Sequence, residues 1–202
     1  MFGGVFMTDN LGKGSLEVIV GPMFSGKTEE IINIAKKMDF ANTHYKIFKP
    51  LIDTRYNPNE IVSHNKSHLP CIRISHGEEI KKHLDSNTQA IIIDEAQFFN
   101  ETFYRDILKL IDEGYRIVIS GLDTDFRGEP FKTVSYLLAI ADKVTKLTAI
   151  CSCCKKPAVM TQRIIDGKPA YYNDPLILIG EKDSYEPRCR NCHKVIYSNG
   201  KE

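Results

Sequence analysis

The chain has 202 residues, enough for one full domain and a small second one. Its 27 Lys and Arg residues nearly balance its 26 Asp and Glu residues, which argues against a strongly basic surface for nucleic acids or anionic membranes. Residues 1–14 are glycine-rich and lack a sustained apolar run. We therefore expect a flexible leader there, and neither a signal peptide nor an anchor. No later segment is apolar over a membrane-spanning length, so we expect a soluble protein of the cytoplasm.

The first predicted elements form a phosphate-binding unit. The apolar run 16–20 predicts a strand, and 28–42 predicts a helix. Between them GPMFSGKT (21–28) has the form G-x-x-x-x-G-K-[ST], whose backbone amides can cradle phosphates at the positive end of the helix. Lys27 can reach the β- and γ-phosphates, and the Thr28 hydroxyl can ligate Mg²⁺. We expect ATP to contact Gly21, Pro22, Met23, Phe24, Ser25, Gly26, Lys27 and Thr28.

Short apolar runs then alternate with helical stretches, which predicts an α/β nucleotide-binding domain over residues 15–149. We expect further strands at 45–48, 71–75, 90–93, 116–120 and 143–147, and helices at 78–84, 101–112 and 133–141. The runs 91–93 and 117–119 are apolar without alternation, as in central strands of a parallel sheet covered by helices on both faces. Residues 51–70 hold prolines and no apolar period, so we expect one long loop there.

Two carboxylates follow the apolar run 90–93, in the sequence Asp94-Glu95-Ala96-Gln97. Ligands of open α/β sheets bind beyond the carboxyl ends of the strands, so all four residues are expected at the ATP site. Asp94 would hold Mg²⁺ directly or through water, and Glu95 would take a proton from the attacking nucleophile. If that nucleophile is water the protein is an ATPase, and if it is an alcohol held in a pocket the protein is a kinase. These motifs alone do not decide between the two.

Five of the six cysteines fall in two clusters, which in an intracellular chain favours a metal site over disulfides. The pairs Cys151/Cys154 and Cys189/Cys192 have the spacing of a structural zinc site closed by four thiolates. Two alternatives remain at this stage: Cys153 could replace Cys154, and His193 could replace Cys192. Between the pairs, Asp166-Gly167 predicts the turn of a hairpin within 158–172.

Five segments occur together in chain order, GPMFSGKT (21–28), DTRY (53–56), DEAQFF (94–99), GLDTDFRGEPF (121–131) and YEPRCRNC (185–192), with the cysteine pair at 151–154 between the last two. Over residues 15–197 the chain closely resembles type II thymidine kinases, the cytosolic, zinc-containing class, in a bacterial form. The resemblance implies transfer of the γ-phosphoryl group of ATP to the 5′-hydroxyl of thymidine, and of deoxyuridine. The product would be dTMP, made in pyrimidine deoxynucleotide salvage for DNA synthesis, with Glu95 as the base.

The same resemblance implies an architecture and an assembly. The fold would be a RecA-like P-loop domain with a central parallel sheet flanked by helices. A small zinc-binding lasso domain, residues 150–197, would close over the nucleoside, followed by a tail at 198–202. The implied assembly is a homotetramer that is inhibited by thymidine triphosphate (dTTP).

The resemblance also assigns a nucleoside pocket. Met23, Leu122 and Tyr185 would surround the thymine methyl group, and Phe98, Phe126 and Phe131 would shape the deoxyribose and base pocket. The backbone of Leu176, Ile177, Leu178, Ile179 and Gly180 would hydrogen-bond the base, while Asp53 and Arg55 match family positions near the phosphates and metal. Taken as a pattern alone, the apolar run at 176–179 could equally be a core strand, and Phe126 and Phe131 could simply pack the core.

A rival from another class is a nucleic-acid-associated ATPase that grips DNA or RNA with a zinc ribbon. Such a ribbon should be basic and interleaved with aromatic residues. Here residues 151–202 hold nine Lys and Arg against six Asp and Glu, scattered along the segment. This mild excess favours the kinase, and we expect no stable nucleic-acid or membrane partner.

Overall fold

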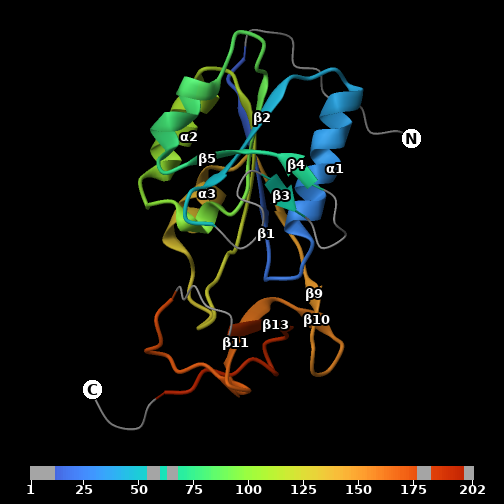
Figure 1. The fold of residues 1–202 in the computed structure, drawn as a ribbon, viewed down its shortest axis with the longest axis vertical. Helices are drawn as coiled ribbons and strands as arrows, with labels where there is room; N and C mark the ends of the chain where they lie inside the picture. The colour runs from blue at the N-terminus through green and yellow to red at the C-terminus, as the bar shows by residue number, and fades with distance from the viewer. Residues whose placement is uncertain (1–11, 54–59, 63–67, 177–182, 198–202) are drawn as a thin grey trace.

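The computed structural model describes residues 12–53, 60–62, 68–176 and 183–197. Its larger region is built on six strands: β1 (Ser15–Val20), β2 (Tyr45–Pro50), β5 (Ile72–Ile74), β6 (Ala90–Ile93), β7 (Arg116–Gly121) and β8 (Lys143–Lys146). They form one sheet in the order β5-β2-β6-β7-β1-β8, and every neighbouring pair is parallel. The sheet occupies the upper part of the molecule in Figure 1. The expected α/β fold with a central parallel sheet is therefore confirmed.

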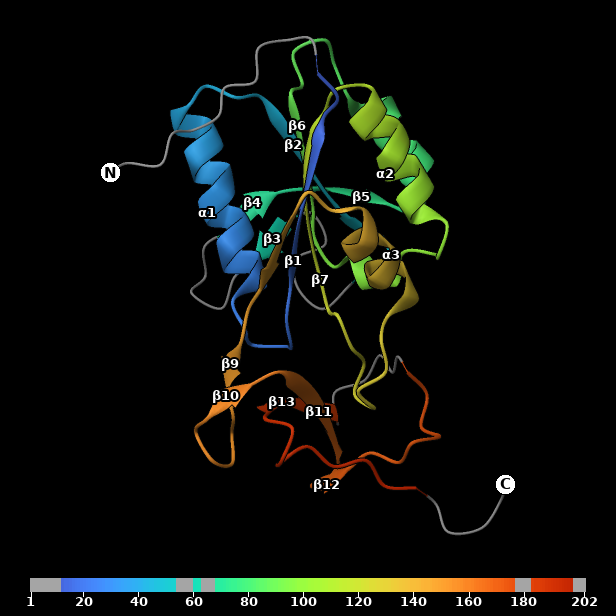
Figure 2. The same cartoon turned by 180° about the vertical axis from the view of Figure 1, so that it is seen from behind.

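Three α-helices cover the sheet: α1 (Lys27–Phe40), α2 (Phe103–Asp112) and α3 (Lys132–Ile140). Helix α1 lies on one face, and α2 and α3 lie on the other (Figures 1 and 2). Successive residues of a strand point to opposite faces, so Ile92 of β6 belongs to the apolar layer under α1. Ile91 and Ile93 belong to the layer under α2 and α3, and all three side chains are fully buried. The prediction that β6 and β7 are inner strands is confirmed.

The predicted ends of these three α-helices agree with the structure to within two residues. The helix expected at 78–84 is instead a 3₁₀ helix, η1 (Gly77–His83), and a second one, η2 (Ala96–Phe98), follows β6. Gly77 allows η1 to approach α2 closely, because a Cβ atom there would lie 2.8 Å from the side chains of Phe103 and Asp106. This contact places η1 against the layer of the core beneath α2.

The prediction of one long loop at 51–70 is wrong in part, because the later part of that segment contains a small antiparallel hairpin. Its strands are β3 (Glu60–Val62) and β4 (His68–Pro70), with Ile61 opposite Leu69. Ile61 is only 2% exposed and packs into the apolar layer under α1. The ammonium group of Lys49 also donates to the Glu60 carbonyl at 3.0 Å. Among the side chains of the hairpin that the structure describes, Ile61 and Leu69 are the apolar ones in this layer, too few to show a period in the sequence.

The second region lies beyond the carboxyl ends of the sheet strands, in the lower part of Figure 1. A short pair, β9 (Ala149–Ile150) and β10 (Pro157–Ala158), precedes a three-stranded sheet of β11 (Met160–Ile165), β12 (Lys168–Pro169) and β13 (Asp183–Arg188). Asp166 and Gly167 join β11 to β12 with φ angles of 47° and 76°. Two successive positive φ angles fit a type I′ turn, and the hairpin predicted around this dipeptide is confirmed.

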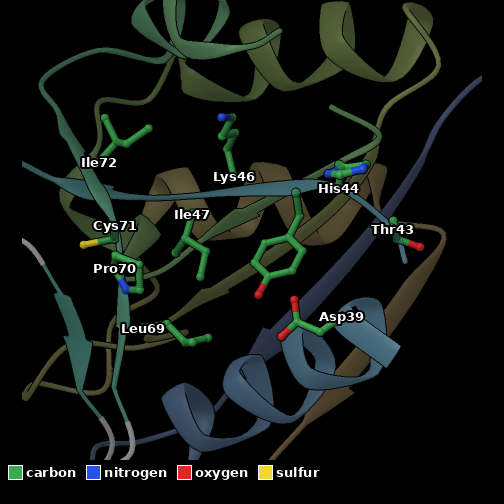
Figure 3. Close-up of a pocket in the computed structure, with 10 residues that line it drawn as sticks. Asp39, Thr43, His44, Lys46, Ile47, Leu69, Pro70, Cys71 and Ile72 are labelled. Atoms are coloured by element: carbon green, nitrogen blue, oxygen red, sulfur yellow. The ribbon is translucent and has the colours of Figure 1, made fainter. Parts of the chain in front are cut away.

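One cavity of about 420 Å³ lies at the amino end of β2 (Figure 3). It is bordered by the end of α1, the first half of β2 and the chain around β4 and β5. In its wall, burial and a hydrogen bond with Asp39 together raise the pKa of Tyr45 to about 12. Phosphate ligands bind at the opposite, carboxyl edge of a parallel sheet, so this cavity lies away from the predicted site. Among the described helices, none has the length and apolar character needed to cross a membrane.

Candidate functional site

The GPMFSGKT loop connects β1 to α1 and depends on unusual backbone angles. Gly21 has a φ of 153°, and a Cβ atom there would lie 2.6 Å from the Leu147 carbonyl oxygen and 2.8 Å from Ser25 Oγ. Phe24 and Gly26 have φ angles of 65° and 86°. Only glycine adopts such angles without cost, so the two fixed glycines allow the tight curl of the loop. Phe24, in contrast, is held in a strained conformation on the surface, with 45% of its side chain exposed.

Lys27 and Ser25 carry polar groups that an anion could satisfy. The ammonium group of Lys27 donates to the carbonyl oxygens of Gly21 at 3.0 Å and Pro22 at 2.8 Å, and the residue is 9% exposed. Ser25 Oγ is buried without a hydrogen-bond partner among the described residues. A phosphate group accepts hydrogen bonds from both kinds of donor. The loop therefore offers donors that a bound anion could use.

Asp94 follows β6 and is brought against the start of α1, as predicted. The hydroxyl of Thr28 donates to Asp94 Oδ2 at 3.1 Å, while the backbone N–H of Glu95 donates to Oδ1 at 2.9 Å. The hydroxyl of Ser120, at the end of β7, also donates to Oδ1. The sequence motifs gave no reason to single out Ser120.

Burial, followed by the neighbouring charge of Glu95, raises the pKa of Asp94 to about 6. The hydrogen bonds from Ser120, Glu95 and Thr28 act in the opposite direction. A buried carboxylate with a raised pKa gains from a nearby divalent cation, which favours the charged form. Thr28 and Asp94 together offer the hydroxyl and carboxylate oxygens that Mg²⁺ prefers.

Glu95 adopts a left-handed conformation with a φ of 58°, which turns the chain between β6 and η2. The side-chain amide of Gln97 donates to the Glu95 carboxylate, and its oxygen accepts the backbone N–H of Leu122 at 3.0 Å. Gln97 is 6% exposed, whereas Glu95 is only partly buried. The structure thus places Gln97 between the predicted base and Leu122, a residue expected at the nucleoside.

The predicted pocket residues fall on both regions of the molecule. The backbone N–H of Met23 donates to the hydroxyl of Thr161 at 3.0 Å, so the phosphate loop touches β11 directly. Tyr185 on β13 lies opposite Arg163, which follows Thr161 by two residues along β11. Thr161 is 2% exposed, and sequence reasoning missed it. No local pattern marks it, since 138 residues separate it from Met23.

The remaining expected pocket residues differ in exposure. Phe126 is 4% exposed and Asp53 is 7% exposed, while Leu122, Phe98 and Phe131 are partly buried. Phe131 packs against the layer beneath α2 and α3, which agrees with the core alternative. Leu176 is 37% exposed. Arg55 and the stretch 177–180 lie outside the described residues, so their expected roles stay predictions.

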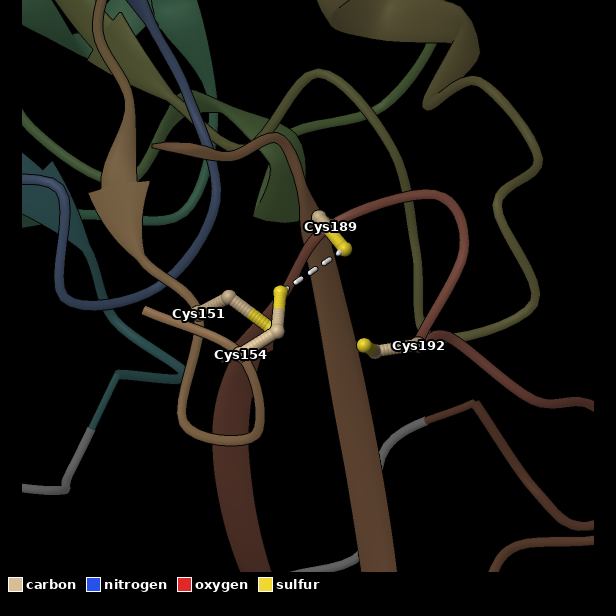
Figure 4. A group of neighbouring side chains, drawn as sticks. All are labelled: Cys151, Cys154, Cys189 and Cys192. Carbon is tan, nitrogen blue, oxygen red and sulfur yellow. Dashed lines mark hydrogen bonds between the residues drawn. The ribbon is translucent and has the colours of Figure 1, made fainter. Parts of the chain in front are cut away.

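Four cysteines meet in the second region (Figure 4). Their sulfur atoms all lie within 4.8 Å of one another, and those of Cys154 and Cys189 are 3.6 Å apart. Thiolates around one tetrahedral zinc ion would be separated by about 3.8 Å, given Zn–S bonds of about 2.3 Å. The cluster of Cys151, Cys154, Cys189 and Cys192 could therefore bind a metal ion such as zinc.

Both alternatives for the ligands are answered by this cluster. Cys154 and Cys192 belong to it, and Cys153 and His193 do not. Cys153 is exposed and accepts a hydrogen bond from Arg188. His193 instead places its Nε2 atom 2.8 Å from the carbonyl oxygen of Phe126. The histidine links the cysteine region to the chain that follows β7.

The thiols in the cluster perturb one another. Burial alone would raise the pKa of Cys151, but hydrogen bonds from the backbone N–H groups of Cys154, Cys189 and Cys153 lower it to about 6. Hydrogen bonds with the thiols of Cys189 and Cys154, together with burial, raise the pKa of Cys192. A bound cation would favour the thiolate form of all four residues.

The phosphate loop, the acidic pair and the four-cysteine cluster agree with the comparison with known families. A family model described as thymidine kinase matches residues 14–193, which is most of the chain. The match includes the loop, the acidic pair and all four cysteines, and it confirms the resemblance found in the sequence. The chain belongs to the thymidine kinase family and is an enzyme that phosphorylates thymidine.

Proposed function

We propose that this protein transfers the γ-phosphoryl group of ATP to the 5′-hydroxyl of thymidine, and of deoxyuridine, in pyrimidine deoxynucleotide salvage for DNA synthesis. The observation that carries the proposal is the meeting of Thr28, Asp94 and Glu95 beside the phosphate loop. The phosphate loop, the proposed Mg²⁺ ligands and the proposed base then lie together at the carboxyl ends of β1 and β6. A phosphoryl group and an acceptor alcohol can meet there.

In this proposal the phosphate loop binds and orients ATP. The residues from Gly21 to Thr28 surround the phosphates, and Lys27 exchanges its bonds to the loop carbonyls for bonds to the β- and γ-phosphates. Thr28 and Asp94 would hold Mg²⁺, which when bound offsets negative charge on the phosphates. Ala96 and Gln97 border the same site. Positioning and charge neutralisation are the main requirements of phosphoryl transfer.

Glu95 acts as the general base. The oxygen of the 5′-hydroxyl attacks the γ-phosphorus, the bond from that phosphorus to the β,γ-bridging oxygen breaks, and ADP leaves. The hydroxyl proton passes to the Glu95 carboxylate. The hydrogen bond from Gln97 supports this role, because it fixes one carboxylate oxygen in a partly buried setting. A general base in such a position contributes about 10²–10⁴ in rate.

The nucleoside is proposed to lie between the two regions. Met23, Leu122 and Tyr185 would surround the thymine methyl group, and Phe98, Phe126 and Phe131 would shape the rest of the pocket. The backbone of 176–180 would bind the base, and Asp53 and Arg55 would act near the phosphates and metal. The direct bond between Met23 and Thr161 supports a pocket at this junction, because it joins the loop to β11.

Zinc is proposed as the ion of the four-cysteine cluster, with a structural role in a lasso domain at 150–197. Family membership also supports three further proposals. These are a homotetrameric assembly, feedback inhibition by dTTP, and a cytoplasmic location.

An assay with ATP and Mg²⁺ tests the function against the nucleic-acid rival. The full chain is incubated with thymidine, with deoxyuridine, or with single-stranded DNA, and nucleoside 5′-monophosphate and ADP are measured. We expect ADP and dTMP in equal amounts, with no stimulation by DNA. ATP hydrolysis that depends on DNA and yields no nucleoside monophosphate would refute the proposal.

A further inference from the structure

The ring of Phe126 lies beside two arginines from different parts of the chain. The guanidinium carbon of Arg127 is 5.1 Å from the ring centroid, and that of Arg163, on β11, is 5.4 Å away. Arg163 is fully buried, and the Arg127 side chain is 20% exposed. Both distances fall within the range of cation–π attraction. Phe126 is thus fixed by two positively charged groups.

The same two arginines hold the chain just before residue 176. Arg127 Nη2 donates to the carbonyl oxygen of Asp174 at 2.8 Å, and Arg163 Nη1 donates to the carbonyl oxygen of Pro175. Two consecutive carbonyl groups are therefore bound from two separate elements. We call Arg127 and Arg163, with the carbonyl groups they bind, the arginine clamp.

Neighbouring side chains reinforce Arg127 in its place. Its guanidinium carbon lies 5.1 Å from the ring centroid of Tyr172, and its Nε lies 4.0 Å from the carboxylate of Asp125. The hydroxyl of Tyr172 donates to Glu129, and its ring stacks on Tyr197 at 5.1 Å between centroids. Aromatic and acidic groups on several segments thus converge on one guanidinium.

A buried guanidinium is costly unless its donors are satisfied, so a core would normally use an apolar residue at such a position. An arginine offers something an apolar residue cannot, because its planar group stacks on a ring and donates hydrogen bonds in fixed directions at the same time. The clamp uses both properties. It fixes Phe126 and the carbonyls at 174 and 175 relative to each other.

We propose that Arg127 and Arg163 are positioning residues for nucleoside binding. The clamp sets Phe126, and the point at which the chain enters the stretch starting at Leu176, in the arrangement that the nucleoside requires. This inference rests on the proposed function, which places both Phe126 and 176–180 at the nucleoside. The clamp contacts the rings of Phe126 and Tyr172 and the carbonyl groups at 174 and 175. Loss of the clamp should therefore affect thymidine far more than ATP or the phosphoryl transfer step.

Steady-state kinetics of the full, zinc-loaded chain test the clamp. We expect Arg127→Met to raise the KM for thymidine by about tenfold, the effect of losing a hydrogen bond from a charged group. The KM for ATP and kcat should stay within about twofold of the wild type, a margin well below that tenfold effect. Arg127→Lys should recover part of the loss, because an ammonium group can still donate to the Asp174 carbonyl. The matched control is Lys168→Met, which removes an exposed positive charge from β12, the strand beside β11 and Arg163.

Hydrogen exchange adds a second readout and covers the buried partner. In Arg127→Met the amides of residues 171–176 should exchange faster, while those of β11 keep their protection. Because Arg163 is fully buried, Arg163→Met also tests folding, so the Arg127 variants decide the question. An unchanged thymidine KM in folded Arg127→Met, or an equal rise in the KM for ATP, overturns the clamp. A wild-type protein that does not phosphorylate thymidine refutes the proposed function instead.

Discussion

Strands β6 and β11 are both buried, but their side chains are chemically opposite. The buried residues of β6 are Ala90 and three isoleucines, whereas those of β11 are Met160, Thr161, Gln162 and Arg163. Burying an apolar side chain stabilises the fold whatever its orientation, since the gain depends mainly on the area removed from water. A buried polar group needs a partner at a defined distance and angle. The two strands are therefore held in place by different physics.

The polar side chains of β11 bind three segments elsewhere in the chain. Thr161 binds the backbone of Met23 in the phosphate loop, and Arg163 binds the carbonyl of Pro175. The Gln162 side chain accepts the backbone N–H of Lys194 at 2.8 Å and donates to its carbonyl at 2.9 Å, just past the last cysteine pair. The apolar sheet thus supplies stability, whereas β11 fixes three segments relative to one another.

The largest expected effect concerns the cysteine region, whose buried apolar cluster consists of Ala149, Cys151 and Ala158. So small a cluster stabilises little, while zinc binding contributes about 10–16 kcal/mol in small zinc modules. We expect one zinc ion per chain. In Cys189→Ser the zinc should be lost and residues 150–197 should lose amide protection, while the sheet stays folded.

Elemental analysis and hydrogen exchange measure these two effects. Cys153→Ser is the matched control, because Cys153 is exposed and lies outside the four-cysteine cluster. It should keep its zinc. Full zinc content in Cys189→Ser, or the same loss in both variants, would contradict the assignment of ligands.

A smaller but still large effect is expected at the acidic pair beside β6. Glu95→Gln keeps the shape of the side chain but cannot accept the proton from the acceptor hydroxyl. We expect kcat to fall by about 10²-fold or more, with nucleotide affinity retained, because only the proton transfer is lost. Turnover is followed by dTMP formation and ATP affinity by calorimetry. Glu113→Gln, an exposed glutamate after α2, should behave like the wild type, and normal turnover in Glu95→Gln would remove Glu95 from the role of base.

The contrast between the two strands also explains what the sequence could predict. The unbroken apolar runs identify β6 and β7 as inner strands, and the Asp166-Gly167 turn defines a hairpin, because both signals are local. The meeting of Thr28 with Asp94 follows from two motifs whose geometry is shared by many nucleotide-binding sheets. The four cysteines are predictable for the same reason, since their spacing reflects one tetrahedral ion.

What the sequence did not reveal depends on partners far along the chain. In the described part of the hairpin β3–β4, the inward apolar side chains are Ile61 and Leu69, which are too few for a visible period. Thr161 and Arg163 occur in a stretch whose polar residues are typical of an exposed strand. Their burial follows from bonds to Met23 and Pro175, which only the folded chain brings near.

Substitution in β6 should reduce stability without changing binding. Ile92→Ala removes a fully buried side chain from the layer beneath α1, so we expect the free energy of unfolding to fall by about 2–5 kcal/mol. Zinc content and the KM for thymidine should not change. Denaturant titration gives the stability, with Val144→Ala on the half-exposed edge strand β8 as a control that should lose less than about 0.5 kcal/mol. A raised KM in Ile92→Ala would show that the apolar core also tunes the pocket.

Substitution in β11 should do the reverse, with a smaller cost in stability and a visible effect on binding. Thr161→Val keeps the volume but removes the oxygen that accepts the Met23 N–H, which should cost about 0.5–1.5 kcal/mol in unfolding. Because Met23 borders both the phosphates and the proposed thymine pocket, we expect the KM for thymidine to rise several-fold. Thr161→Ser restores the hydroxyl and should return the KM close to that of the wild type. If Thr161→Val loses stability but keeps its KM for thymidine, β11 contributes to stability alone, as β6 does. The position of the phosphate loop would then depend on other contacts.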